Sequence, residues 1–71
     1  MSSQETEADR TPQWLKSRLV VALRNANLGV PSGWGLERQA TYAVRLKGGG
    51  LVSFDNPHTV RRAISLLEAP R

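Results

Sequence analysis

The sequence predicts an α+β fold with the order helix–strand–strand–helix, in which two helices pack on one face of a small antiparallel sheet. Two segments, starting at Pro12 and at Pro57, carry apolar side chains at helical spacing. Between them, residues 36–47 alternate between apolar and polar side chains, and three glycines separate this run from a second apolar run. Because both helices can cover the same apolar face, the other face of the sheet is expected to be open.

The chain has 71 residues, which is enough for one small domain over residues 11–71. It contains no Cys and a single His, so disulfides and thiolate or multi-histidine metal sites are excluded, and no cofactor is expected. A domain of this size buries only about 60% of the surface that its unfolded chain exposes. A homodimer or another binding partner would therefore help to stabilise it.

Residues 1–10 contain three acids and no aromatic or β-branched aliphatic side chain, and we expect them to form a disordered acidic tail. This start lacks the basic and apolar segments of a secretory signal. No apolar stretch approaches the roughly 20 residues that cross a bilayer. The protein is therefore expected to be soluble and cytoplasmic, without membrane contact.

The first helix is expected to begin at Thr11-Pro12, with the threonine hydroxyl as its cap and the proline at the first helical position. It should end at Leu28-Gly29, where glycine supplies a left-handed turn. Its apolar side chains recur at helical spacing and line one face, and they are Leu15, Leu19, Ala22, Leu23 and Ala26. A second stripe repeats every seven residues on a neighbouring face and consists of Trp14, Val21 and Leu28.

Residues 30–35 are rich in glycine and proline and are expected to form a loop. The alternation from Leu36 to Lys47 is typical of a strand. Its apolar side would be formed by Leu36, Ala40, Tyr42, Val44 and Leu46. Arg38 is the exception on that side, and it could mark a bend or a break that leaves a third short strand within residues 30–40.

Gly48-Gly49-Gly50 is expected to reverse the chain into a β-hairpin. A two-residue turn would place Val52 and Phe54 on the charged face, whereas a three-residue turn joins them to the apolar face. We adopt the three-residue turn, which leaves Arg45 and Lys47 together on the open face. The glycines could also approach a phosphate, but the lysine–hydroxyl pair of a nucleotide-binding loop does not follow them.

The last helix is expected to begin at Pro57, after the polar cap Asp55-Asn56. Its buried face would be formed by Val60, Ala63, Ile64 and Leu67. Asp55, His58 and Thr59 lie together at this helix start, and ordinary capping explains them better than catalysis does. No enzymatic activity is expected.

Positive charge is concentrated outside the first ten residues. The formal net charge is +4, of which residues 1–10 contribute −2 and residues 11–71 contribute +6. A basic body of this kind attracts phosphate-rich polyanions. We therefore expect a small non-catalytic nucleic-acid-binding protein, a regulatory or accessory factor that contacts DNA or RNA through the open sheet face. The expected contacts are Arg45 and Lys47 on the hairpin, supported by Arg38, Arg61 and Arg62.

A protein-interaction or inhibitor module is the alternative hypothesis. It would contact a second copy of the chain or a larger partner through apolar and tryptophan side chains that one small core cannot hide. This interface would consist of Trp14, Val21, Leu28, Trp34 and Leu51. Trp34, between two glycines, could instead fold over the core or stack on a base.

The strand–turn–strand–helix pattern over residues 42–68 resembles the DNA-reading sheet of integrase arm-binding domains. The likeness covers less than half of this chain, and a helix precedes it here where that family has a strand. The resemblance implies a basic sheet face that lies in the major groove of DNA. The helix–sheet–helix order is also similar to that of double-stranded RNA-binding domains, although Pro57-His58-Thr59 does not match their basic signature at the last helix.

Overall fold

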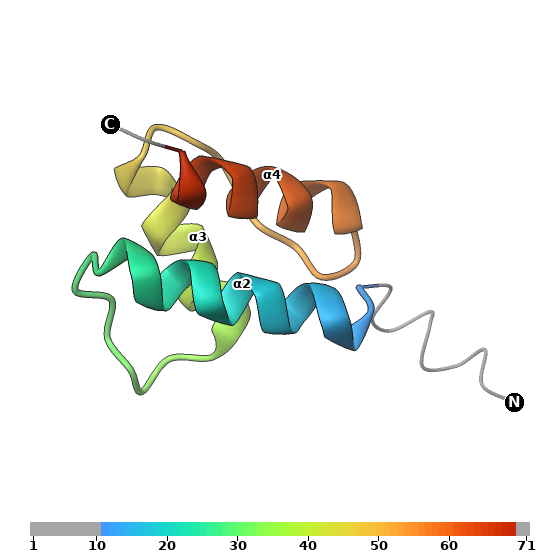
Figure 1. Ribbon diagram of the computed structural model, residues 1–71, viewed down its shortest axis with the longest axis horizontal. Helices are drawn as coiled ribbons and strands as arrows, with labels where there is room; N and C mark the ends of the chain where they lie inside the picture. The colour runs from blue at the N-terminus through green and yellow to red at the C-terminus, as the bar shows by residue number, and fades with distance from the viewer. Residues whose placement is uncertain (1–10, 70–71) are drawn as a thin grey trace, which may run out of the picture.

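The computed structural model describes residues 11–69; residues 1–10, for which we predicted a disordered tail, and residues 70–71 lie outside this range. Within it the chain forms three helices, α2 (Gln13–Ala26), α3 (Leu36–Leu46) and α4 (Pro57–Glu68), and no strand. The predicted α+β fold, with two helices on one face of an antiparallel sheet, is therefore wrong. The described part of the chain is all-helical (Figure 1).

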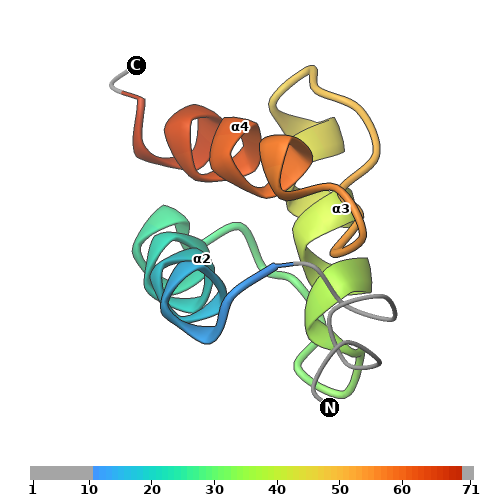
Figure 2. The same cartoon turned by 90° about the vertical axis from the view of Figure 1, so that its right-hand side faces the viewer.

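The helices form two layers. α2 and α4 lie side by side and run in the same direction, and α3 crosses behind both of them (Figures 1 and 2). The contact between α2 and α4 is the most extensive of the three helix pairs. One core joins all three helices and one residue of the segment before α4, and it consists of Leu15, Leu19, Ala22, Ala40, Ala43, Val44, Val52, Val60, Ala63, Ile64 and Leu67.

α4 confirms the sequence prediction for the last helix. It begins at Pro57, and the side chain of Asn56 caps it by accepting a hydrogen bond of 3.1 Å from the backbone N–H of His58. The side chains predicted for its apolar face are all buried, and they are Val60, Ala63, Ile64 and Leu67. A proline at the first helical position costs no hydrogen bond, because the N–H of that residue has no partner within the helix. The start of α4 could therefore be predicted from the sequence.

α2 confirms the predicted apolar face, with Leu15, Leu19 and Ala22 buried and Leu23 and Ala26 partly buried, but it differs from the prediction at both ends. Thr11 does not cap the helix; its hydroxyl donates to the backbone carbonyl of Phe54, 2.6 Å away, and the residue is buried. At the other end the helix stops at Ala26, two residues earlier than predicted. Asn27 takes the left-handed conformation there, with φ of 50°, because asparagine tolerates that region better than other non-glycine residues.

α3 occupies the segment that was predicted to be a strand. Leu36, Ala40 and Val44 are four residues apart, so they satisfy an alternating pattern and a helical one equally. In the helix Ala43 is also buried and Arg38 is exposed. The helix therefore explains why the charged Arg38 occupied the apolar side of the predicted strand. Neither the strand over residues 36–47 nor the third short strand within residues 30–40 exists.

The glycine triplet ends α3 instead of turning a hairpin. The N–H of Gly49 donates to the carbonyl of Val44 at 2.8 Å, and the N–H of Gly48 donates to that of Arg45 at 3.0 Å. Gly48 is left-handed, with φ of 86°. This pair of hydrogen bonds is the Schellman motif, in which a glycine after the last helical residue satisfies the terminal carbonyls. The predicted β-hairpin and its three-residue turn are therefore wrong.

The segment between Gly50 and Asn56, predicted to be the second strand, crosses the molecule without a partner strand. Val52 is 2% exposed, and its backbone N–H donates to the hydroxyl of Thr41 at 3.2 Å. The same hydroxyl lies 3.3 Å from the carbonyl oxygen of Val52. Its one hydrogen also lies within reach of the carbonyl of Glu37, at an oxygen–oxygen distance of 3.0 Å. A threonine on α3 thus supplies the acceptor that a neighbouring strand would have given to the N–H of Val52.

Two further helix side chains complete the backbone pairing of this segment. The hydroxyl of Thr59 accepts from the N–H of Ser53 and reaches its carbonyl, both at 2.9 Å. The carboxylate of Glu37 accepts from the N–H of Phe54 at 2.6 Å. Since side chains satisfy these groups one by one, the segment can be partly buried without belonging to a sheet. It ends in a turn, in which the N–H of Asn56 donates to the carbonyl of Ser53 at 3.1 Å.

Candidate functional site

The side of α3 that faces away from the core carries arginine and aromatic side chains. Arg38, Tyr42 and Arg45 are four and then three residues apart, so they follow one line along the helix. Both arginines are exposed, and Tyr42 is 39% exposed. Trp34, in the loop just before the helix, lies against this line. We call these four residues, Trp34, Arg38, Tyr42 and Arg45, the α3 outer face.

Trp34 connects Arg38 to Tyr42 on this face. The guanidinium carbon of Arg38 lies 4.2 Å from the centre of the Trp34 ring, close enough for a cation–π interaction. The rings of Trp34 and Tyr42 meet edge to face, with centroids 5.5 Å apart and an interplanar angle of 85°. Trp34 is half-buried, so its contacts hold the ring in place while part of it stays accessible.

The chemistry of the α3 outer face suits a ligand that has both negative charge and flat rings. Guanidinium groups bind phosphate oxygens through paired N–H donors. Aromatic rings stack on unpaired bases, and a guanidinium plane can do the same. The carboxylate nearest in sequence, Glu37, points elsewhere and accepts a hydrogen bond from the backbone of Phe54.

The structure separates the predicted nucleic-acid contacts into different places. Arg38 and Arg45 share the α3 outer face, whereas Lys47 is the half-buried residue that caps the end of α3. Arg61 and Arg62 are exposed on α4, and the Arg61 guanidinium carbon lies 5.7 Å from the Trp14 ring centre. The open sheet face that was expected to gather Arg45 with Lys47 does not exist.

The predicted protein interface is also divided. Trp14 and Val21 share one face of α2 and are 54% and 52% exposed. Leu28 is half-buried in the loop after α2, Trp34 belongs to the α3 outer face, and Leu51 is exposed in the segment that leads to α4. These five side chains therefore come from several elements of the fold and do not follow one stripe.

Sequence reasoning missed Tyr42, which it placed on a buried sheet face. The missing signal was the helical spacing between Tyr42 and the two arginines, which becomes visible only when residues 36–46 are treated as a helix. It also assigned no binding role to Arg18. In the structure Arg18 lines a groove between α2 and α4 together with Trp14 and Arg61.

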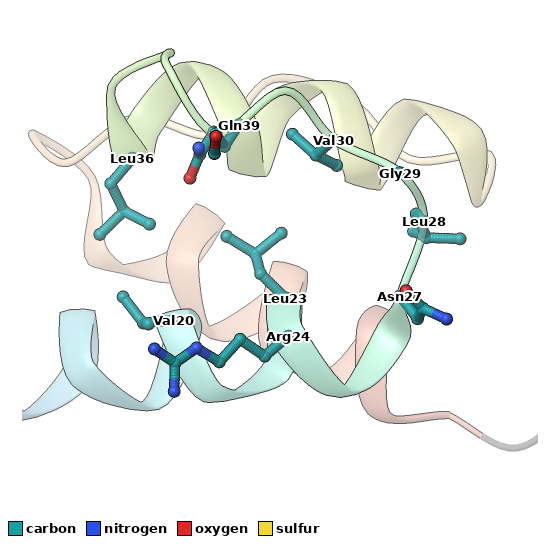
Figure 3. Close-up of a pocket in the computed structure, with 10 residues that line it drawn as sticks. Val20, Leu23, Arg24, Asn27, Leu28, Gly29, Val30, Leu36 and Gln39 are labelled. Atoms are coloured by element: carbon teal, nitrogen blue, oxygen red, sulfur yellow. The ribbon is translucent and has the colours of Figure 1, made fainter.

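An open pocket of about 430 Å³ lies where the end of α2, the following loop and the start of α3 meet (Figure 3). Leu23, Val30 and Leu36 supply apolar lining, and Arg24 extends along one side of it. The side-chain amide of Gln39 donates to the carbonyl of Pro31 at 2.9 Å, which ties the loop to α3. This pocket therefore lies at the connection between α2 and α3, and its lining includes none of the residues of the α3 outer face.

Residues 11–69 contain no group of three His, Asp or Glu side chains arranged to hold a metal ion. His58 is exposed, and the hydroxyl of Thr59 is engaged with the backbone of Ser53 and Asn56. In the same part of the chain, every helix is too short and too polar to span a membrane.

Comparisons with protein-family models, with curated proteins and with solved structures found no match to this chain. Any function must therefore be argued from the geometry and charge of its own side chains.

Proposed function

We propose that the protein binds nucleic acid, without catalysing a reaction, through the α3 outer face. The observation that carries this proposal is the placement of Arg38 over Trp34, with Tyr42 against the same ring and Arg45 further along the same line. Two cations and two aromatic rings on one exposed helix face provide both phosphate contacts and stacking surfaces.

The charge of the chain supports the same proposal. Residues 11–69 contain eight Lys and Arg residues against three acids, Glu37, Asp55 and Glu68. One of these acids, Glu37, has its carboxylate at the backbone of Phe54 and is not part of the α3 outer face. An excess of positive charge draws polyanions at long range, and the α3 outer face would then orient them.

Reversing both arginine charges, in Arg38→Glu/Arg45→Glu, is expected to weaken binding to a fluorescein-labelled 20-nucleotide single strand by at least about tenfold. Losing two phosphate contacts should also lower the magnitude of the slope of log affinity against log salt by about 1.4 units on the single strand. Fluorescence anisotropy between 50 and 200 mM salt measures both quantities. A duplex of the same length shows whether accessible bases matter, since the rings can stack only on unpaired ones.

The matched control is Arg24→Glu/Arg62→Glu, which changes the net charge by the same amount at exposed positions of α2 and α4. It is expected to weaken binding by clearly less than the α3 pair does. Equal losses in the two double variants would mean that only the total charge counts, and the α3 outer face would then have no special role. Absence of salt-sensitive binding to any of these oligonucleotides would contradict the proposal altogether.

A further inference from the structure

A second exposed surface lies between α2 and α4, on the side away from α3. Among residues 11–69 its lining comes from these two helices, with Leu15 and Ile64 below and with Trp14, Arg18, Arg61, Ser65 and Glu68 around them. The cavity between them is about 240 Å³. We call it the α2–α4 groove. α3 crosses the other side of the helix pair (Figure 2), and no residue of α3 lines the groove.

We propose that the α2–α4 groove binds an acidic amphipathic helix of a protein partner. A helix of this kind presents apolar side chains at spacings of three and four residues, with carboxylates beside them. The groove has the complementary pattern, because the exposed ring of Trp14 lies between a guanidinium group on α2 and another on α4. Leu15 and Ile64, at the bottom of the groove, are only 3% and 6% exposed.

The positions of the two arginines are the reason why the partner helix should be acidic. Arg18 stands on α2, one helical turn after Trp14, and Arg61 stands on α4 with its guanidinium carbon 5.7 Å from the Trp14 ring centre. A carboxylate on the partner could pair with either of them through two parallel N–H donors. Val21, 52% exposed on the same face of α2, extends the apolar contact beyond the groove.

A second copy of the chain fits this groove less well. In a twofold interface the same patch meets itself, so Arg18 and Arg61 would face identical positive charges with only Glu68 to offset them. Residues 1–10 of the chain offer three acids but only Met1 and Ala8 as apolar side chains, so they could match the charge and leave the Trp14 ring uncovered. A nucleic acid would bring its phosphates against Glu68.

The chain contains two tryptophans, and each of the two surfaces contains one of them. The indole N–H signals of Trp14 and Trp34 in a ¹⁵N-NMR spectrum therefore report on the α2–α4 groove and on the α3 outer face separately. The two signals can therefore show that peptide binding in the α2–α4 groove fails while nucleic-acid binding at the α3 outer face holds, or the reverse.

The probe is a synthetic helical peptide of the same length as α2, 14 residues, with Leu on one face and Glu on the other. The full chain is titrated with this peptide and with a counterpart in which every Glu is replaced by Lys. We expect the acidic peptide to shift the Trp14 signal with saturation below about 1 mM and to leave Trp34 unmoved. The basic peptide should shift neither.

The deciding variant is Arg18→Glu/Arg61→Glu, which should weaken binding of the acidic peptide at least about tenfold and allow the basic peptide to bind. Arg24→Glu/Arg62→Glu, with the same net charge, should bind the acidic peptide almost as tightly as the unmodified chain does. The proposal is overturned if the two peptides bind alike, if the Arg18/Arg61 variant still binds the acidic peptide, or if the oligonucleotide moves Trp14.

Two further results would assign the groove to another occupant and so overturn the proposal. A Trp14 signal that moves with the concentration of the chain alone, together with a doubled mass in solution, would assign it to a second copy. A Trp14 signal that moves when Glu5, Glu7 and Asp9 are changed to their amides, with no peptide present, would assign it to residues 1–10.

Discussion

Gly49→Ala is expected to destabilise the protein by about 1–3 kcal/mol, because overfilling a packed site costs energy of this size. A Cβ atom at Gly49 would overlap Cγ1 of Val44 and lie 2.8 Å from Cδ1 of Leu66. Val44 is buried in the core, so its side chain has no room to move aside. A chain of this length has only about 4–10 kcal/mol of stability in total. Urea unfolding followed by circular dichroism measures the loss.

The other two glycines of the triplet provide controls. Gly50→Ala adds a methyl group into open space at a position without positive φ, and its effect should stay within about 0.5 kcal/mol. Gly48→Ala meets no atoms either, but its φ of 86° should cost about 1–2 kcal/mol of backbone strain. Had the triplet formed a free hairpin tip, Gly49 and Gly50 would behave alike, so equal stabilities of their alanine variants would contradict the structure.

Thr41→Val is expected to cost about 1–3 kcal/mol, because it leaves the backbone N–H of buried Val52 without a hydrogen-bond acceptor. Valine has the shape of threonine and a similar helix propensity, so packing and helix formation in α3 change little. Unfolding in urea gives the free energy. Hydrogen exchange at Val52 gives a local measure, and this amide should exchange faster in the variant.

Thr41→Ser is the matched control for the hydroxyl. It keeps the acceptor and loses only a methyl group, so it should retain most of the stability and the slow exchange at Val52. If valine and serine at position 41 had the same effect, the methyl group would be what matters. The hydrogen bonds of Thr41 would then not be what holds residues 51–55 in place.

The two outer helices could be predicted because their signals are local. Pro57 and the cap before it define the start of α4, and the spacing of Leu15, Leu19 and Ala22 admits only a helical period. α3 could not be predicted in this way. Its apolar residues Leu36, Ala40 and Val44 fit both periods, and a following run of glycines can end a helix or connect two strands.

The segment around Val52 was missed for a different reason. A short run of apolar and β-branched residues predicts a strand because its backbone groups need partners, and a sheet is the usual source. Here Thr41, Thr59 and Glu37, from two separate helices, supply those partners one at a time. No pattern within the segment itself reveals such distant side-chain acceptors.

The wrong prediction of a strand in place of α3 also made the predicted candidate site wrong. Arg38 and Arg45 could be selected as candidates from their charge alone. Their position beside Trp34 and Tyr42 follows only when the segment is treated as a helix. Once residues 36–46 are treated as a strand, Arg38 becomes an exception and Tyr42 becomes a core residue. The α2–α4 groove was missed because it requires knowing that two helices distant in sequence lie side by side.

The side-by-side, same-direction arrangement of α2 and α4 also affects how the chain folds. Thirty residues, 27–56, separate the two helices that share the largest contact. Closing a loop of this length costs about 3 kcal/mol of chain entropy before that contact contributes anything. An isolated helix as short as α2 is marginal in water, and it does not find its main packing partner until α4 has been synthesised. The fold should therefore form late and cooperatively, with no stable intermediate made of α2 and α3 alone.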